Sequence, residues 1–362
     1  MELTFKNAPH YLQSLLDRKD DCPASSLYIF GQPLIVHNIA IAQNICEIDA
    51  VSMPDGFSNA STLIQDAFPT LSVNEFHDEN GNNGIRENTN NNSFDYTEDT
   101  LQAISCNRCN IPIRRRPSEK LELPINSVLH YGSPSPALSD YVSPVNNESL
   151  MVDIVTYPWE FLNSVGNVLK KEVTRTVISP TASIAKTSII QGPCLIEDDV
   201  TIDDFCKIVG PTYLGNGSFI GMSSLVRNSM LGTKTKIGFN CEIARAYFEG
   251  GGEVAHQNVI LDSIIGKNVW FGGYSGTANV LLNKKNVRFQ VGHRLLDTGT
   301  WRFGTVVGNN CAIGADVIIL PGREVPSNSV IQAGTVFGKK NTHCLSAYDK
   351  GLETNEIPGK TG

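Results

Sequence analysis

An aliphatic side chain recurs every six residues through the second half of the chain. The first run of such positions is Ile178, Ile184, Ile190, Ile196, Ile202, Ile208, Leu214, Ile220 and Val226. The run continues one residue out of step at Leu231, Ile237 and Ile243, and after an interruption it returns as Val307, Ile313, Ile319, Val325, Ile331 and Phe337. Neither an α-helix, with a period of 3.6, nor an ordinary strand, with a period of two, produces this spacing.

A six-residue period predicts a triangular solenoid. Each unit is one short strand and one tight turn, and its aliphatic residue points inward and stacks on the equivalent residue one coil above. Gly and Asn fit the turns because positive φ costs them little. Three units close one coil, so the repeats predict roughly six to seven coils of a parallel β-helix.

The pattern is interrupted at two places. The first expected break is near 246–253, where Glu249-Gly250-Gly251-Gly252 reads as an insert, and the second and larger one spans about 271–306. A regular solenoid is scaffold, so we expect the chemistry at the larger break, where an extruded loop places polar groups beyond the flat faces.

The part of the chain before the repeats follows a different pattern. Helical spacing of apolar residues predicts helices over 33–42 and 158–173, and 48–53 reads as a strand that a Pro-Asp-Gly turn closes. Between 74 and 99 the chain is dominated by Asn, with acids and Gly between, which indicates a low-complexity insert. We therefore expect a smaller α/β domain over 1–173 with the insert 74–99, a β-helix over 174–340 and a tail over 341–362.

Composition narrows the function classes. The 362 residues have a formal net charge of -8 and no sustained basic tract, which argues against nucleic acid or an anionic membrane surface as partner. There is no signal-like N-terminus and no stretch approaching 18 apolar residues, so we expect a cytoplasmic protein. The nine cysteines read as buried thiols, and the pair Cys106 and Cys109 lacks the second pair that a zinc site needs, which favours a free or redox-active pair.

Candidate chemistry gathers at the larger break. Its cations are Lys284, Lys285, Arg288, Arg294 and Arg302, together with His293. Several cations in one loop suit a phosphorylated ligand, and a merely solvated loop is the alternative. His256 lies just before the break and is a candidate general base, against the alternative of a turn histidine that caps a carbonyl. Two histidines are too few for a three-histidine zinc site, so no metal site is expected in the repeats.

Four motifs carry a resemblance to a known family. They are His256 to Gly266, Gly276-Thr277-Ala278-Asn279, Asn283 to Arg288, and Gly304-Thr305-Val306-Val307-Gly308. In order and spacing they resemble the left-handed β-helix acetyltransferase half of archaeal-type bifunctional sugar-1-phosphate nucleotidylyltransferase/acetyltransferases. A weaker match, Gly31 to Ile39, resembles a helix start in the nucleotidylyltransferase half. The Gly-rich triphosphate loop and the Pro-Lys motif of that half are missing, so the resemblance implies a degenerate nucleotidylyltransferase-like domain over 1–173.

The resemblance implies a set of roles. His256 would take a proton from the amino group of a sugar as it attacks the thioester of acetyl-CoA, the cosubstrate. Asn279 is the second candidate catalytic residue, and the resemblance implies that it holds the sugar phosphate together with the basic residues after it. Lys285 and Arg288 would hold the sugar phosphate, and Gly304 and Thr305 would accommodate the coenzyme between neighbouring subunits of a homotrimer. The expected activity is acetyl-CoA-dependent N-acetylation of an amino sugar or its 1-phosphate.

Two positions depart from the family pattern. Val259 stands where the family commonly has Tyr, and Leu281 stands where it commonly has Arg. The missing Arg would have contacted phosphate. Two alternatives therefore stay open: a non-catalytic sugar-nucleotide-binding or regulatory subunit, and a functioning sugar-1-phosphate nucleotidylyltransferase.

Overall fold

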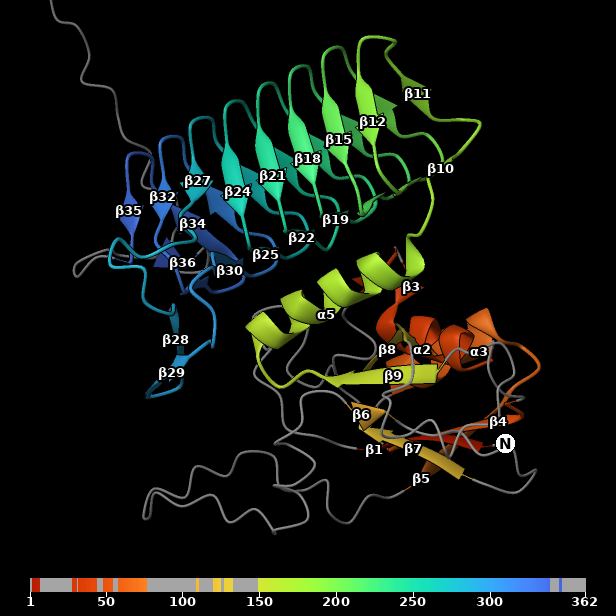
Figure 1. Cartoon of the computed structure of the whole chain (residues 1–362). Helices are drawn as coiled ribbons and strands as arrows, with labels where there is room; N and C mark the ends of the chain where they lie inside the picture. Colours follow the sequence, from red (N-terminus) through yellow and green to blue (C-terminus); the bar gives the residue numbers. More distant parts are fainter. Residues whose placement is uncertain are drawn as a thin grey trace, which may run out of the picture.

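The structure has an N-terminal α/β part and a long solenoid, joined by one helix that lies along the solenoid (Figure 1). It is a computed structural model, and it describes residues 2–6, 28–30, 32–43, 48–54, 58–76, 109–110, 120–124, 127–132, 149–338 and 345–346. The fold class predicted from the repeats, a left-handed parallel β-helix behind a smaller α/β part, is confirmed.

Three stacks of parallel strands form the faces of the solenoid. The first face consists of β10 (Val177–Ile178), β13 (Cys194–Ile196), β16 (Thr212–Leu214), β19 (Met230–Leu231), β22 (Tyr247–Phe248), β25 (Ile264–Ile265), β30 (Thr305–Val307) and β33 (Arg323–Val325). The second face consists of β11 (Ser183–Ile184), β14 (Thr201–Ile202), β17 (Phe219–Ile220), β20 (Lys236–Ile237), β23 (Glu253–Val254), β26 (Trp270–Phe271), β31 (Ala312–Ile313) and β34 (Ser329–Ile331), and an antiparallel strand, β36 (Leu345–Ser346), pairs with β34. The third face consists of β12 (Ile189–Gln191), β15 (Lys207–Val209), β18 (Leu225–Arg227), β21 (Glu242–Ala244), β24 (Val259–Leu261), β27 (Gly276–Thr277), β32 (Ile318–Ile319) and β35 (Val336–Phe337).

The solenoid has eight coils, more than the six to seven expected. The expected break at 246–253 does not occur, because Phe248 and Val254 take inward positions and pair with Leu231 and Ile237 of the preceding coil. Around these residues most coils are 17 residues long instead of 18. The shorter coil moves the inward residue out of the six-residue register but does not interrupt the stack of coils.

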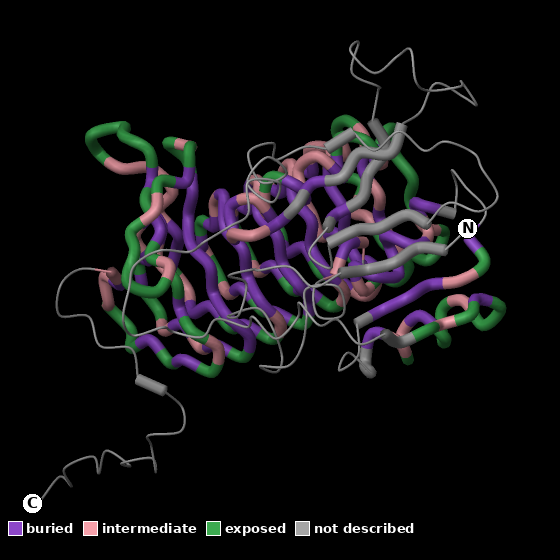
Figure 2. Tube along the Cα trace, turned by 90° about the horizontal axis from the view of Figure 1, so that it is seen from below, coloured by how far each residue is buried: buried purple, intermediate pink, exposed green. Residues whose placement is uncertain are grey.

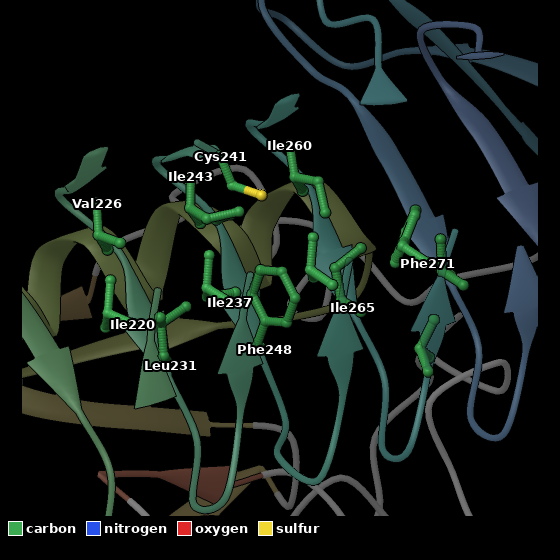
Figure 3. Close-up of a cluster of buried hydrophobic side chains, with 14 of the residues drawn as sticks. Ile220, Val226, Leu231, Ile237, Cys241, Ile243, Phe248, Ile260, Ile265 and Phe271 are labelled. Atoms are coloured by element: carbon green, nitrogen blue, oxygen red, sulfur yellow. The ribbon is translucent and has the colours of Figure 1, made fainter. Parts of the chain in front are cut away.

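The repeated aliphatic residues form the core. The labelled side chains from Ile220 to Phe271 point into the interior, each stacked against equivalents in adjacent coils (Figure 3). Along each coil, buried positions alternate with exposed ones (Figure 2). Burying one such side chain stabilises the fold by about 1.5–3 kcal/mol, so the column of stacked residues supplies most of the solenoid's stability.

The corners follow the expected turn chemistry in part, because Asn is common there but residues of other types also adopt a positive φ. Asn240, Asn268 and Arg245 all adopt a positive φ, near +50°. At the corner between the first and second faces, the Asn268 amide donates to Asn310, and the Asn310 amide donates to Asn328, at 3.2 and 3.3 Å. Equivalent residues of successive coils therefore stack at the corners as they do in the core.

The large insertion begins later than expected. Phe271 and Thr277 still belong to regular strands, and the chain leaves the solenoid only after β27. It returns at Thr305, so that Ile265 pairs with Val307 across the whole insertion. Within the insertion, β28 (Arg288–Val291) and β29 (Arg294–Asp297) form an antiparallel hairpin that stands away from the coils (Figure 1).

The N-terminal part contains a parallel sheet in the order β5-β4-β1-β7. Its strands are β1 (Glu2–Lys6), β4 (Ala50–Pro54), β5 (Ser72–Phe76) and β7 (Lys120–Pro124), and its helices are α2 (Leu34–Gln43) and α3 (Ser58–Ala67). An antiparallel sheet has β6 (Cys109–Asn110) and β8 (Ser127–Gly132) on either side of β9 (Ser149–Ile154), and β2 (Tyr28–Ile29) pairs with β3 (Gln32–Pro33). Residues 74–76 of the expected low-complexity insert belong to β5, and the rest of that insert lies outside the described residues.

Helix α5 (Pro158–Glu172) covers the outer side of the first face. Pro158 opens the helix, and the Glu160 carboxylate accepts hydrogen bonds from the backbone N–H groups of Thr156 and Tyr157 at 2.8 and 3.0 Å. Its buried side chains pack on the outward residues of that face, and the ring centroids of Phe161 and Tyr247 lie 4.9 Å apart. The second and third faces carry no such helix in the described part of the chain.

Two sequence expectations concern cysteines and membranes. Cys194, Cys206, Cys241 and Cys311 are free, buried thiols in the solenoid, as expected, and burial raises the pKa of Cys194 to about 11. Cys106 of the Cys106/Cys109 pair lies outside the described residues. None of the helices described is both long enough and apolar enough to cross a membrane.

Glu172, the last residue of α5, makes the stability of the fold depend on pH. The Glu172 side chain is only 14% exposed, its Oε1 accepts no hydrogen bond from any described group, and the nearest cationic candidate is His37 Nε2 at 3.7 Å. Burial raises the Glu172 pKa from 4.5 to about 8. The folded state therefore holds this proton more tightly, so its stabilising contribution is complete below about pH 4.5 and is lost as the pH rises through about 8.

Glu172→Gln should remove that loss, since glutamine keeps the shape without the charge. One pKa unit is worth about 1.4 kcal/mol, so the variant should gain a few kcal/mol over the wild type between pH 5 and pH 8.5. Urea denaturation of both proteins at the two pH values measures this difference. A variant that is less stable at pH 8.5 would show that Glu172 is instead ionised and paired with a protonated His37.

Candidate functional site

His256 lies at the corner between the second and third faces, in the turn from β23 to β24. Its side chain is exposed, and its backbone carbonyl accepts a hydrogen bond from the Tyr274 N–H at 2.9 Å. On the other side of this corner, the Gln257 N–H donates to the Phe239 carbonyl at 2.8 Å. His256 is therefore stacked in a column of corner residues with its imidazole facing outward, which suits a group that exchanges protons with a ligand.

Asn279 lies at a different corner, the one between the third and first faces. Its amide donates to Asp262 Oδ2 at 2.5 Å, and Asp262 also accepts from Nε and Nη2 of Arg245 at 2.5 and 2.7 Å. Asp262 is 6% exposed, and the hydrogen bond to Asp262 keeps the pKa of the Arg245 guanidinium above its usual value. The Asp262–Arg245 pair fixes the Asn279 amide and leaves its side-chain carbonyl oxygen available to accept a hydrogen bond.

The structure does not bring His256 and Asn279 together within one chain. The Tyr274–His256 hydrogen bond places His256 beside the residues that enter β27, whereas Asn279 follows β27. The two side chains therefore stand at opposite edges of the third face. Extended backbone rises about 3.3 Å per residue, so the edges are roughly 15–20 Å apart.

Lys285 and Arg288 lie in the inserted loop and line one open pocket of about 560 Å³. The other lining residues are Leu281, Asn283, Lys284, Asn286 and Asp297. Lys284, Lys285 and Arg288 are exposed cations against a single carboxylate, so the lining is net positive and offers amide groups as well. Such a set of donors fits an anionic, oxygen-rich ligand.

Gly304 and Thr305 lie where the insertion rejoins the solenoid, close to Asn279, whose backbone carbonyl accepts from the Phe303 N–H at 3.0 Å. A Cβ at Gly304 would overlap Ser263 Oγ and the Leu261 carbonyl, so close backbone packing requires glycine here. Thr305 is fully buried, and its hydroxyl donates to the Arg323 carbonyl at 2.5 Å. These two residues thus have structural roles, and coenzyme contact by them stays a prediction.

Sequence reasoning gave no role to Arg245 and Asp262. Arg245, Asp262 and Asn279 are spaced by 17 residues, the length of one coil, so they stack at one corner. That signal was present in the sequence, but it can be used only once the length of the coil is known. Among the residues that the structure describes, no three His, Cys, Asp or Glu side chains gather where a metal ion could bind.

The coils, the corner residues and the inserted loop define the chain as a hexapeptide β-helix protein with one large insertion. No family profile matches it. Its C-terminal half is 28% identical, over 184 residues, to a bifunctional sugar-1-phosphate nucleotidylyltransferase/acetyltransferase of Sulfurisphaera tokodaii, covering 50% of this chain and 45% of that protein. It is 30% identical over 183 residues to the bifunctional protein GlmU of Methanococcus vannielii, covering 50% and 43%.

An uncharacterized acetyltransferase, YaiX of Escherichia coli O6:K15:H31, is 27% identical over 162 residues, covering 45% of this chain and 63% of that protein. The resemblance inferred from the four sequence motifs is thus confirmed. The chain spans less than half the length of the two bifunctional relatives.

The close packing around Gly304 can be tested through the stability of the protein, without any ligand. Gly304→Ala should destabilise the protein by about 1–3 kcal/mol, because the added methyl group overlaps the coil that carries Leu261 and Ser263. Gly166→Ala is the matched control: nothing lies within 4 Å of its Cβ position on α5, so alanine should stabilise by up to about 1 kcal/mol. Thermal unfolding of both variants measures the pair. Unchanged stability in Gly304→Ala would contradict the structural role.

Proposed function

We propose that the chain is a cytoplasmic acetyl-CoA-dependent N-acetyltransferase that acts on an amino sugar or an amino-sugar 1-phosphate. The observation that carries the proposal is the cationic pocket of Lys284, Lys285 and Arg288, which opens a few residues after Asn279 in the part of the chain that is similar to acetyltransferases. A sugar phosphate matches this lining, since its phosphate can pair with the cations and its hydroxyls with the amides.

The proposed chemistry is acyl transfer to nitrogen. The sugar amino group attacks the thioester carbonyl carbon of acetyl-CoA, the new C–N bond forms, and the C–S bond breaks. A neutral His256 imidazole takes the proton that the nitrogen loses and passes it to the departing thiolate sulfur, so that coenzyme A leaves as the thiol. Asp262 holds the side-chain amide of Asn279. The side-chain carbonyl oxygen of Asn279 accepts a hydrogen bond from a ligand hydroxyl group and so orients the ligand.

The separation of His256 from Asn279 leads to a second element of the proposal. One acceptor cannot reach both side chains on a single chain, so the site combines the His256 corner of one subunit with the Asn279 corner of the next. Exposed apolar side chains surround the His256 corner: Phe239 is 43% exposed, Val259 42%, Trp270 45% and Tyr274 65%. Such a patch is typical of a subunit contact, and it supports a homotrimer built on the free faces of the solenoid.

Leu281 favours a second candidate, a non-catalytic sugar-nucleotide-binding subunit. It lines the pocket and packs against the apolar cluster that includes α5, at the position where the resemblance expects an arginine. The pocket therefore has one phosphate contact fewer than the family pattern. Ligand binding without acetyl transfer would support this candidate.

The proposal extends to the parallel sheet of the N-terminal part. The order β5-β4-β1-β7 changes direction next to β1, and in parallel sheets ligands bind beyond the carboxyl ends of strands at such a point. The residues that follow β1 lie outside the described part of the chain. Because the sequence lacks a triphosphate loop, we propose a degenerate nucleotidylyltransferase-like domain without nucleotidyl transfer.

Activity of His256→Ala tests the proposed reaction. The substitution should lower acetyl transfer by roughly 10²–10⁴-fold, the usual effect of a positioned general base. The assay follows thiol release from acetyl-CoA with a panel of amino sugars and their 1-phosphates. Coenzyme binding should barely change, because the base contacts the acceptor. Wild-type protein that binds these sugars and transfers no acetyl group would contradict the enzyme proposal.

Mixing two inactive variants tests the shared site. His256→Ala and Asn279→Ala should each be nearly inactive, whereas co-assembled subunits should regain activity, because about a quarter of all interfaces in a random equal mixture pair an intact His256 with an intact Asn279. Light scattering should give three times the 39.4 kDa chain mass. A monomer at micromolar concentration, or no recovery in verified mixed assemblies, would overturn this part.

A further inference from the structure

An aromatic cluster joins the N-terminal turn of α5 to the base of the inserted loop. Trp159 stacks on Tyr157 with ring centroids 4.6 Å apart and contacts Phe289 and Phe303 edge to face at 5.8 and 6.4 Å. Phe289 and Phe303 also contact each other at 5.9 Å. Trp159, Phe289 and Phe303 are all buried, so this cluster, the aromatic clamp, is a closed apolar contact.

Two contacts hold the hairpin to the rest of the molecule: this aromatic contact and the approach of β28 to Gly322. Two-stranded hairpins are marginally stable on their own, and β28–β29 stands away from the coils (Figure 1). The hydrogen bonds of Val287 to Thr298 and Thr300 stay within the inserted loop. On the solenoid side, the Arg288 carbonyl lies against Gly322, where a Cβ would collide with it.

The clamp also determines where two proposed ligand contacts point. Val287 and Phe289 are buried, and Arg288 between them is exposed toward the pocket, as strand alternation requires. Phe303 adds a second connection, since its backbone N–H donates to the backbone carbonyl of Asn279. Anchoring Phe289 therefore positions Arg288, and anchoring Phe303 positions the backbone of Asn279.

Helix α5 in turn belongs to the N-terminal part. The Asn167 amide donates to Asp153 of β9 at 2.8 Å, and Val128 of β8 is in the same apolar cluster as Trp159. We infer that Trp159 is a positioning residue through which the N-terminal part holds the anion-binding loop in its binding geometry. The identity of the ligand in this inference rests on the proposed function. The aromatic clamp does not depend on that function.

Two variants on one helix test the inference. Trp159→Ala should raise KM for glucosamine 1-phosphate, the probe, about tenfold, with little change in kcat and little change for unphosphorylated glucosamine. Trp159→Phe should raise this KM much less than Trp159→Ala does. Phe161→Ala is the matched control, because it removes a buried ring that packs on Tyr247 of the solenoid, away from the loop.

Tryptic cleavage gives a readout that needs no activity. Lys284, Lys285 and Arg288 are cleavage sites, so freeing the loop in Trp159→Ala should speed cleavage there about tenfold, while Phe161→Ala should cleave like the wild type. If the wild type transfers no acetyl group, this arm still tests the clamp. Equal cleavage and equal KM in Trp159→Ala and Phe161→Ala would overturn the inference.

Discussion

The stacking of one inward side chain on its equivalent in the next coil is the constraint from which the rest of the solenoid follows. Ile237, for example, pairs with Ile220 on one side and Val254 on the other, and all three are almost fully buried. Removing such a side chain typically costs about 2–5 kcal/mol, so register errors are strongly disfavoured. Once the core is in register, the corners stack as well, and residues one coil apart become neighbours.

The three faces then have different surroundings. The first face is covered because its outward residues are large and apolar, and α5 offers a matching stripe of Trp159, Phe161, Val165 and Leu169. The third face lies between the corner of His256 and the corner of Asn279. A flat face of this width keeps its two edges apart, which is why the proposed site, which uses both edges, needs a second chain.

The inserted loop shows how a rigid scaffold accommodates a binding loop. The loop leaves after Thr277 and returns at Thr305 without disturbing the pairing of Ile265 with Val307. Its buried apolar residues, Val287, Phe289 and Phe303, belong to the cluster that includes α5. Its cations Lys284, Lys285 and Arg288 are exposed. The pocket therefore depends on two supports that are distant in sequence: the glycine contact of the solenoid at Gly322 and the aromatic contact of α5 at Trp159.

The sequence by itself determined the solenoid, because one aliphatic residue per six is a local pattern that neither an α-helix nor an ordinary strand produces. It also identified His256, Asn279, Lys285 and Arg288 as residues of interest, through their motifs. It predicted a break at 246–253 that does not exist, because a coil shortened by a single position shifts the period without interrupting the stack. Only the tertiary structure separated His256 from Asn279, buried Gly304 and Thr305, and joined Trp159 to Phe289. Those outcomes depend on coil length and on contacts between distant segments, which a local period does not encode.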